Sequence, residues 1–234
     1  MTLLILAASL ILGPSLVPMD YPARLERAVA SADADALRDL RGELGRPREI
    51  REPAALYTLA YVDWRLAGLL DGKQRKQLAL EAQEALERLL EHRPGDAEAL
   101  ALLGSVYGMR ITGWLSGMSL GRKAEAALRE AADRAPDNPR VALQHGVSAF
   151  FSPRAFGGGL DRAETRLRHA LDLFAREPGD RPWPDWGHVE AWACLGQVLA
   201  PKGDVPGARA AYTRALELEP DHLWVRDVLL PELD

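Results

Sequence analysis

Five histidines and a single cysteine are the side chains of this sequence that could bind a transition metal or act as a nucleophile. The histidines are His92, His145, His169, His188 and His222. No two of them have the i, i+4 spacing of a helical zinc site, and no HExxH motif occurs. Cys194 lies in an apolar stretch, where a small buried side chain is expected more often than a nucleophile. The sequence therefore predicts no metal site, no cofactor and no catalytic residue.

Two further patterns could suggest an enzyme. The segment 117–123 (GMSLGRK) has glycines and basic residues like a phosphate-binding loop, but it lacks the GxxxxGK[ST] spacing and follows no predicted strand. Acidic residues are numerous, yet they fall on the solvent-facing sides of predicted helices. A hydrolase with an acidic pair in a groove is therefore the least favoured alternative, and we expect a protein that is not an enzyme.

Composition excludes other classes of function. Hydrophobic residues are 47% and charged residues 27% of the 234 positions, which is typical of a globular protein and allows one large domain or two small ones. The formal net charge of -5 argues against a nucleic-acid partner, because such proteins usually carry a basic domain or stripe. One cysteine excludes an intramolecular disulfide framework.

The N-terminus begins with an apolar run, residues 2–12 (TLLILAASLIL). This run is too short for a membrane span, which needs about 20 residues, and its length suits a secretory signal peptide over residues 1–15. It lacks the usual basic start, so a buried N-terminal helix in a cytoplasmic protein is the alternative. We expect a periplasmic or secreted protein with no membrane span after processing. The 25 arginines against 4 lysines are typical of a bacterium with a GC-rich genome.

Prolines recur at a fixed interval. Pro94, Pro136, Pro178 and Pro220 are each 42 residues apart, and each follows an Ala/Leu-rich amphipathic run. Because proline cannot continue a helix, each one predicts a helix end. Pro53, 41 residues before Pro94, is expected to open the series.

Glycines form a second recurrent pattern. Gly104, Gly146 and Gly196 lie inside apolar helical stretches, where glycine costs about 1 kcal/mol relative to alanine. A helix with small and large residues on one face follows each of them: Ala124-Leu128-Ala131, Ala163-Leu167-Ala170 and Ala208-Tyr212-Ala215. The pattern predicts that this second helix packs closely against the glycine of the first.

These residues resemble the tetratricopeptide repeat (TPR), a 34-residue helix-turn-helix unit. The last unit has the family spacing at Trp192, Leu195, Gly196, Ala208, Tyr212, Ala215 and Pro220. The resemblance covers residues 97–222, with eight and five extra residues in the turns of the two preceding units. It implies an all-α fold, a right-handed superhelical solenoid of stacked helix-turn-helix repeats with capping helices.

The expected organisation has four parts. They are a signal peptide (1–15), N-terminal capping helices (20–52), a TPR-like repeat domain (53–222, units ending near 94, 136, 178 and 220) and a C-terminal capping helix (221–234). The N-terminal cap is predicted to be two short helices broken at residues 31–33. In the C-terminal cap, Leu223, Trp224, Asp227 and Val228 are spaced to cover the last repeat. No strand pattern occurs in the sequence.

The resemblance also implies a concave groove lined by the first helices of the units. Carried over onto this sequence, it gives the groove residues Glu98, Ala101, Ser105, Arg140, Leu143, Gln144, Val147, Glu190, Ala193 and Gln197. Insertions between helices add Trp114, Phe156, Trp183 and Trp186, aromatic residues that either bind a partner or cover gaps between repeats.

The sequence favours a non-enzymatic scaffold that binds a protein or peptide, exported in a bacterium. The alternative is a periplasmic accessory subunit of a solute transport system of the TRAP-associated TPR kind, with a pocket for a small ligand. An open groove would favour the scaffold, and a deep pocket lined by tryptophan and phenylalanine would favour the transport subunit. The identity of the partner and the oligomeric state stay open.

Overall fold

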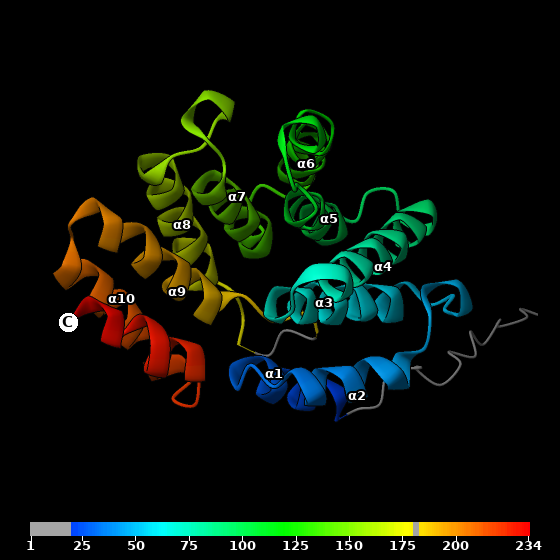
Figure 1. Cartoon of the computed structure of the whole chain (residues 1–234), viewed down its shortest axis with the longest axis horizontal. Coiled ribbons are helices and arrows are strands. Elements are labelled where there is room, and N and C mark those ends of the chain that lie inside the picture. The colour runs from blue at the N-terminus through cyan, green and yellow to red at the C-terminus, as the bar shows by residue number, and fades with distance from the viewer. Residues whose placement is uncertain (1–19, 180–182) are drawn as a thin grey trace, which may run out of the picture.

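A computed structural model describes residues 20–179 and 183–234, and within these residues all regular structure is helical (Figure 1). The predicted signal peptide lies outside the described residues. The α-helices are α1 (Tyr21–Ala30), α2 (Ala34–Leu44), α3 (Pro53–Leu69), α4 (Gly72–His92), α5 (Ala97–Met109), α6 (Trp114–Arg134), α7 (Pro139–Phe151), α8 (Leu160–Phe174), α9 (His188–Leu199) and α10 (Val205–Leu218).

Short polar side chains fix several helix starts. The carboxylate of Asp33 accepts hydrogen bonds from the backbone N–H groups of Asp35 and Ala36, both at 3.0 Å, at the start of α2. Asp96 and Asn138 cap α5 and α7 in the same way. Such caps satisfy N–H groups that have no partner within the helix. The predicted break between two N-terminal helices is confirmed, since α1 ends at Ala30 and α2 begins after Asp33.

The repeated prolines follow helix ends, as predicted. Helices α4, α6 and α10 each end two residues before a proline, and α8 ends four residues before Pro178. Pro53 has a different role, because it is the first residue of α3. At that position proline loses no hydrogen bond, and its fixed φ angle suits the helix.

The helices pack as consecutive pairs, α3 with α4, α5 with α6, α7 with α8 and α9 with α10. Neighbouring pairs contact each other through α4 and α5, α5 and α7, and α8 and α9, so the pairs follow one another in an arc (Figure 1). The first helices α5 and α7 run parallel. Near their N-terminal ends Asn138 Nδ2 donates to Glu98 Oε1 at 2.7 Å, and further along both helices the Ser105 hydroxyl donates to the Gln144 side chain.

Each of the three mid-helix glycines contacts its partner helix directly. A Cβ atom on Gly104 would lie 2.7 Å from Leu128 Cγ, and one on Gly146 would lie 2.7 Å from Leu167 Cδ2. A Cβ atom on Gly196 would overlap the Tyr212 ring even more closely. The predicted close approach is therefore confirmed, and the large residue in the middle of each second-helix pattern occupies the space that a first-helix side chain would need.

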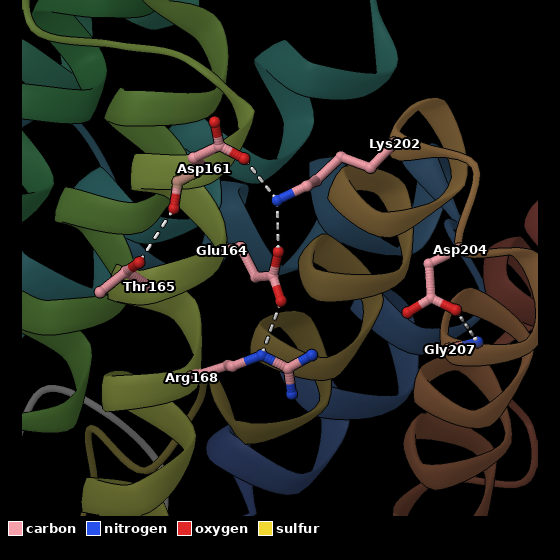
Figure 2. A network of polar contacts seen from close by, with 7 residues as sticks. All are labelled: Asp161, Glu164, Thr165, Arg168, Lys202, Asp204 and Gly207. Carbon is pink, nitrogen blue, oxygen red and sulfur yellow. Dashed lines mark hydrogen bonds and ion pairs between the residues drawn. The ribbon is translucent and has the colours of Figure 1, made fainter.

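Ion pairs join α8, in the pair α7–α8, to the turn between α9 and α10. Lys202, in the turn between α9 and α10, donates from Nζ to Asp161 Oδ1 at 2.5 Å and to Glu164 Oε2 at 2.7 Å (Figure 2). Arg168, one turn further along α8, donates from Nε to Glu164 Oε1 at 2.9 Å. Figure 2 shows these side chains converging between α8 and the α9–α10 turn.

The C-terminal segment differs from the prediction. Trp224 and Val228 are exposed, whereas Val225 and Leu229 are buried against α9 and α10. The reason is that the His222 side chain is itself buried. Residues three and seven positions after it, Val225 and Leu229, share its helix face and therefore also face the protein interior. The segment forms a short π-helical turn, η4 (Val225–Leu229), in which the Leu230 N–H donates to the Val225 carbonyl at 3.0 Å.

The glycine contacts lead to a stability prediction. We expect Gly196→Ala to lower the free energy of unfolding by about 1–3 kcal/mol, because the added methyl group overpacks the contact with Tyr212. Gly108→Ala on α5 is the control, since a Cβ atom there meets nothing within 4 Å, and it should raise stability by up to about 1 kcal/mol. Urea unfolding of both variants measures the difference. Equal effects would mean that α9 and α10 do not meet at this glycine.

Candidate functional site on the concave side

Helix α3 is the first helix of the first pair and lies on the inner side of the arc together with α5, α7 and α9 (Figure 1); we call this the concave side. Its sequence PAALYTLAYVDWRLAGL is apolar around most of its circumference, which is typical of a helix covered on all sides. Tyr57, Thr58 and Tyr61 are buried, and Trp64 and Arg65 are partly buried. A further element must therefore cover this helix in addition to its partner α4.

The connection between α8 and α9 supplies that cover with two tryptophans. Trp186 Nε1 donates a hydrogen bond to the Tyr57 hydroxyl at 3.1 Å, and Trp183 Nε1 donates to Thr58 Oγ1 at 3.0 Å. The ring of Tyr61 lies 4.8 Å from that of Trp186 and 5.5 Å from that of Trp183, between centroids. We call Tyr57, Tyr61, Trp64, Trp183 and Trp186 the aromatic cluster. It joins the first pair of helices to a segment about 125 residues later in the chain.

Two contacts anchor the start of this connection. Arg140 on α7 donates from both terminal nitrogens to the carboxylate of Glu177, at 2.6 and 3.0 Å. Such a bidentate pair fixes geometry as well as adding energy. The Arg140 guanidinium also lies 5.6 Å from the centroid of the Phe174 ring, at the end of α8.

Gly187 fixes the end of the connection. It has a φ angle of +115°, which a side chain would disfavour, and a Cβ atom there would lie 2.8 Å from Phe174 Cζ. The next residue, His188, stacks on Phe174 with ring centroids 5.1 Å apart and planes 6° from parallel. The tryptophans are thus held between two fixed ends.

The predicted groove residues are largely buried. Arg140 and Gln144, expected to face a partner, are each only 1% exposed, because Arg140 holds Glu177 and Gln144 bonds to Ser105. Their interpretation as an accessible binding stripe is corrected accordingly. Ala101, Leu143, Ala193 and Glu98 are also buried, whereas Ser105, Val147, Glu190 and Gln197 are partly exposed.

The insertion residues divide into two groups. Trp186 is buried and Trp183 partly buried in the aromatic cluster, so these two side chains cover α3. Trp114 and Phe156 are 74% and 75% exposed. From the sequence, each of the four side chains could either bind a partner or cover a gap between repeats. In the structure, the first two are buried or partly buried and the other two are exposed.

A pocket of about 410 Å³ lies beside the aromatic cluster. Its lining combines apolar and aromatic residues with polar ones: Pro53, Ala54, Tyr57, Leu89, Ala97, Trp183 and Pro184, and Arg93, Asp96, Glu98 and Asn138. Of the predicted site residues, the pocket brings together Glu98 and Trp183. Arg93 and Ala54 are exposed and so accessible to a partner. Such a lining can contact apolar groups of a partner and form hydrogen bonds with its polar groups.

Ionisable groups meet on the other side of the cluster. Arg65 Nη1 and Glu190 Oε1 are 2.8 Å apart and join α3 to α9. The Arg65 guanidinium also lies 5.7 Å from the Trp64 ring centroid. Burial, together with the negative charges of Glu190 and Glu26, raises the pKa of Glu219 to about 7. A carboxyl group thus titrates near neutral pH where the first and last pairs of helices meet.

The α3 residues of this site were missed in the sequence. The repeat domain was predicted to begin at residue 53, but no groove residue was predicted before Glu98. The pattern that could have found the site is the run of aromatic residues at Tyr57, Tyr61 and Trp64, which share one face of a helix that is apolar around most of its circumference.

The site contains little that could perform catalysis. Burial raises the pKa of the Cys194 thiol to about 12, so the thiol stays protonated at neutral pH. No group of three or more metal-binding side chains occurs within residues 20–179 and 183–234. Over the same residues, no helix is both long and apolar enough to cross a membrane.

Comparison with solved structures shows a TPR-like helical repeat fold. TTC0263, a thermophilic TPR protein of Thermus thermophilus, matches over 91% of this chain and 98% of its own, with 22% identity and a TM-score of 0.63. The HusA haemophore of Porphyromonas gingivalis matches over 77% of this chain and 94% of its own, with 23% identity and a TM-score of 0.62. No protein-family model and no curated protein matches the sequence.

The raised pKa of Glu219 predicts a pH-dependent stability. The folded state binds a proton at Glu219 more tightly than the unfolded state, whose carboxyl has the ordinary pKa near 4.5. Between about pH 4.5 and pH 7, Glu219 should therefore contribute a fall in the free energy of unfolding, and Glu219→Gln should remove this contribution. The histidines whose pKa values burial lowers, His145, His188 and His222, contribute a rise that both proteins share. Glu217→Gln, at an exposed position on the same helix, is the control and should leave the pH dependence unchanged. Thermal melts across this pH range measure it, and an unaltered slope in Glu219→Gln would contradict the assignment.

Proposed function

We propose that this protein is a non-enzymatic helical-repeat scaffold that binds a segment of a protein or peptide at the concave pocket. The proposal rests on the pocket itself. The aromatic cluster covers one part of α3, and the pocket stays open beside that part. A hollow lined by both apolar and polar residues suits an extended segment, whose side chains and backbone need both.

The chemistry of the pocket favours anchoring by a few residues. Trp183 and Tyr57 are already held by hydrogen bonds, so little side-chain freedom would be lost when a partner contacts them. Arg93 adds an exposed cation at the rim, and arginine is enriched among residues that dominate binding energy. Helical stacking provides the rigid frame that keeps these groups in place.

A small ligand is the second candidate. The pocket volume of about 410 Å³ lies in the range of small-molecule sites, and the similar HusA structure is that of a haemophore. This candidate corresponds to an accessory subunit of a periplasmic solute transport system. We further propose export of the protein, which is supported by the apolar run at residues 2–12.

Site-specific crosslinking in the native host tests the proposal. A photoreactive phenylalanine analogue at Ala54, which is exposed at the pocket, should form an adduct with one protein partner. The same analogue at Gln74, exposed on α4 and not part of the pocket, should not form this adduct. With the purified partner, Arg93→Glu should weaken binding about tenfold or more, and Arg129→Glu on α6 should leave it unchanged.

The outcomes separate the two candidates. Equal adducts from Ala54 and Gln74, or unchanged affinity in Arg93→Glu, would remove the pocket as the protein-binding site. A small molecule that co-purifies with the wild type and is lost in Arg93→Glu would support the transport subunit instead.

A further inference from the structure

Six large apolar side chains are exposed around two neighbouring turns. The turn between α5 and α6 and the first helical turns of α6 carry Ile111, Trp114, Leu115 and Met118, and the end of α7 and the turn to α8 carry Phe151 and Phe156. Trp114, Leu115, Phe151 and Phe156 each expose more than 70% of their surface. We call these six residues the apolar edge. None of them lines the concave pocket.

Both turns lie at the same edge of the molecule. Helices α5 and α7 pack against each other and run parallel, since Glu98 contacts Asn138 near their starts and Ser105 contacts Gln144 further on. The turns that follow these two helices therefore leave the stack in the same direction. The apolar side chains of the two turns can face one common surface.

The first turns of α6 project beyond the helix that they follow. Lys123 Nζ lies 5.6 Å from the Tyr107 ring centroid, and Gly104 lies opposite Leu128. These two contacts mean that α5 and α6 run antiparallel, because a later residue of α5 meets an earlier residue of α6. Continued in the same way, the pairing places Met109, the last residue of α5, opposite the region of Gly121. The part of α6 before Gly121 has no length of α5 beside it, and this part carries Trp114, Leu115 and Met118.

Charge is distributed unevenly around the apolar edge. No aspartate or glutamate occurs between Glu98 and Glu125 or between Asp137 and Asp161, although the chain has 34 acidic residues. Three basic residues in these stretches are exposed: Arg122, Lys123 and Arg154. These two stretches thus carry only basic charges in a chain whose formal net charge is -5, and the nearest acidic neighbour of Arg154 that borders them is Asp161, which is paired with Lys202.

The next pair of helices marks the limit of this edge. The corresponding turn between α9 and α10 contains Lys202, which is paired with Asp161 and Glu164 of α8 (Figure 2). At the α9–α10 turn, the ion pairs of Lys202 with Asp161 and Glu164 stand in place of the large exposed rings of the two preceding turns. Among the described residues, the large apolar side chains that are more than 70% exposed are therefore confined to two adjacent turns.

We propose that the apolar edge docks on the surface of an anionic lipid bilayer. Tryptophan and phenylalanine rings on projecting turns can enter the boundary between headgroups and acyl chains, while the basic residues beside them attract anionic headgroups. Exposed rings on projecting turns can insert into a deformable lipid surface. A peptide ligand would instead need a hollow in the protein surface to bind in. This inference does not depend on a partner at the concave pocket.

Vesicle co-sedimentation of the full chain tests this inference. The wild type should bind vesicles of equal parts phosphatidylglycerol and phosphatidylcholine, more weakly at high salt, and should bind pure phosphatidylcholine vesicles less well. The double variant Trp114→Ser/Phe156→Ser should bind at least about tenfold more weakly. Both side chains are largely exposed, so an unchanged melting temperature should accompany the loss.

Two further variants make the result specific. Leu218→Ser removes an exposed leucine at the opposite edge and should bind like the wild type. Lys123→Glu/Arg154→Glu should weaken binding to the anionic vesicles and reduce its dependence on salt. Residues 1–19 are identical in every variant, so they cannot cause a difference between them.

Two results would overturn the proposal. One is equal vesicle binding by the wild type and Trp114→Ser/Phe156→Ser. The other is absence of vesicle binding together with a concentration-dependent dimer, seen by light scattering, that this double variant abolishes. That second result would make the apolar edge a contact between two copies of this chain.

Discussion

Packing of Trp183 and Trp186 on α3 determines which part of the concave side is accessible. Stacked helix pairs contact mainly their neighbours, so such a fold ordinarily leaves its first helices open to solvent. Here the connection after α8 crosses that side and places two indole rings on Tyr57, Thr58 and Tyr61. The pocket beside the aromatic cluster is what remains. Arg140 and Gly187 support this packing, because they hold the two ends of the connection between α8 and α9 in place.

The local part of this structure could be predicted from the sequence, and the long-range part could not. Mid-helix glycines and the large residues opposite them, such as Gly146 and Leu167, recur in each unit once the extra residues in the turns are allowed for, so the helix pairs were predictable. The burial of Arg140 was not, because its partner Glu177 lies beyond the end of α8, and the repeat spacing does not predict which side chains after a helix end contact a neighbouring first helix. The cover over α3 was missed for the same reason. In the C-terminal segment, burial of His222 selected a different face from the one that the apolar spacing suggested.

The molecule has two surfaces of different chemistry. The concave pocket combines aromatic and hydrogen-bonding groups, which supports binding of a segment with specific side chains. The apolar edge combines exposed rings with exposed basic residues, which supports contact with an anionic lipid surface. The two surfaces share no residues, so the proposed partner and the proposed lipid surface would not compete for the same site. The rigid stack of helix pairs would then fix the distance between them.

A double-mutant cycle between Tyr57 and Trp186 tests the central claim most directly. These residues are 129 positions apart and share a hydrogen bond only if the α8–α9 connection lies on α3. The conservative variants Tyr57→Phe and Trp186→Phe, and the double variant, are compared by urea unfolding. The contact predicts a coupling free energy of about 0.5–1.5 kcal/mol, so the double variant should lose less stability than the sum of the single losses. Strict additivity of the two losses would contradict the covering of α3 and, with it, the shape of the pocket.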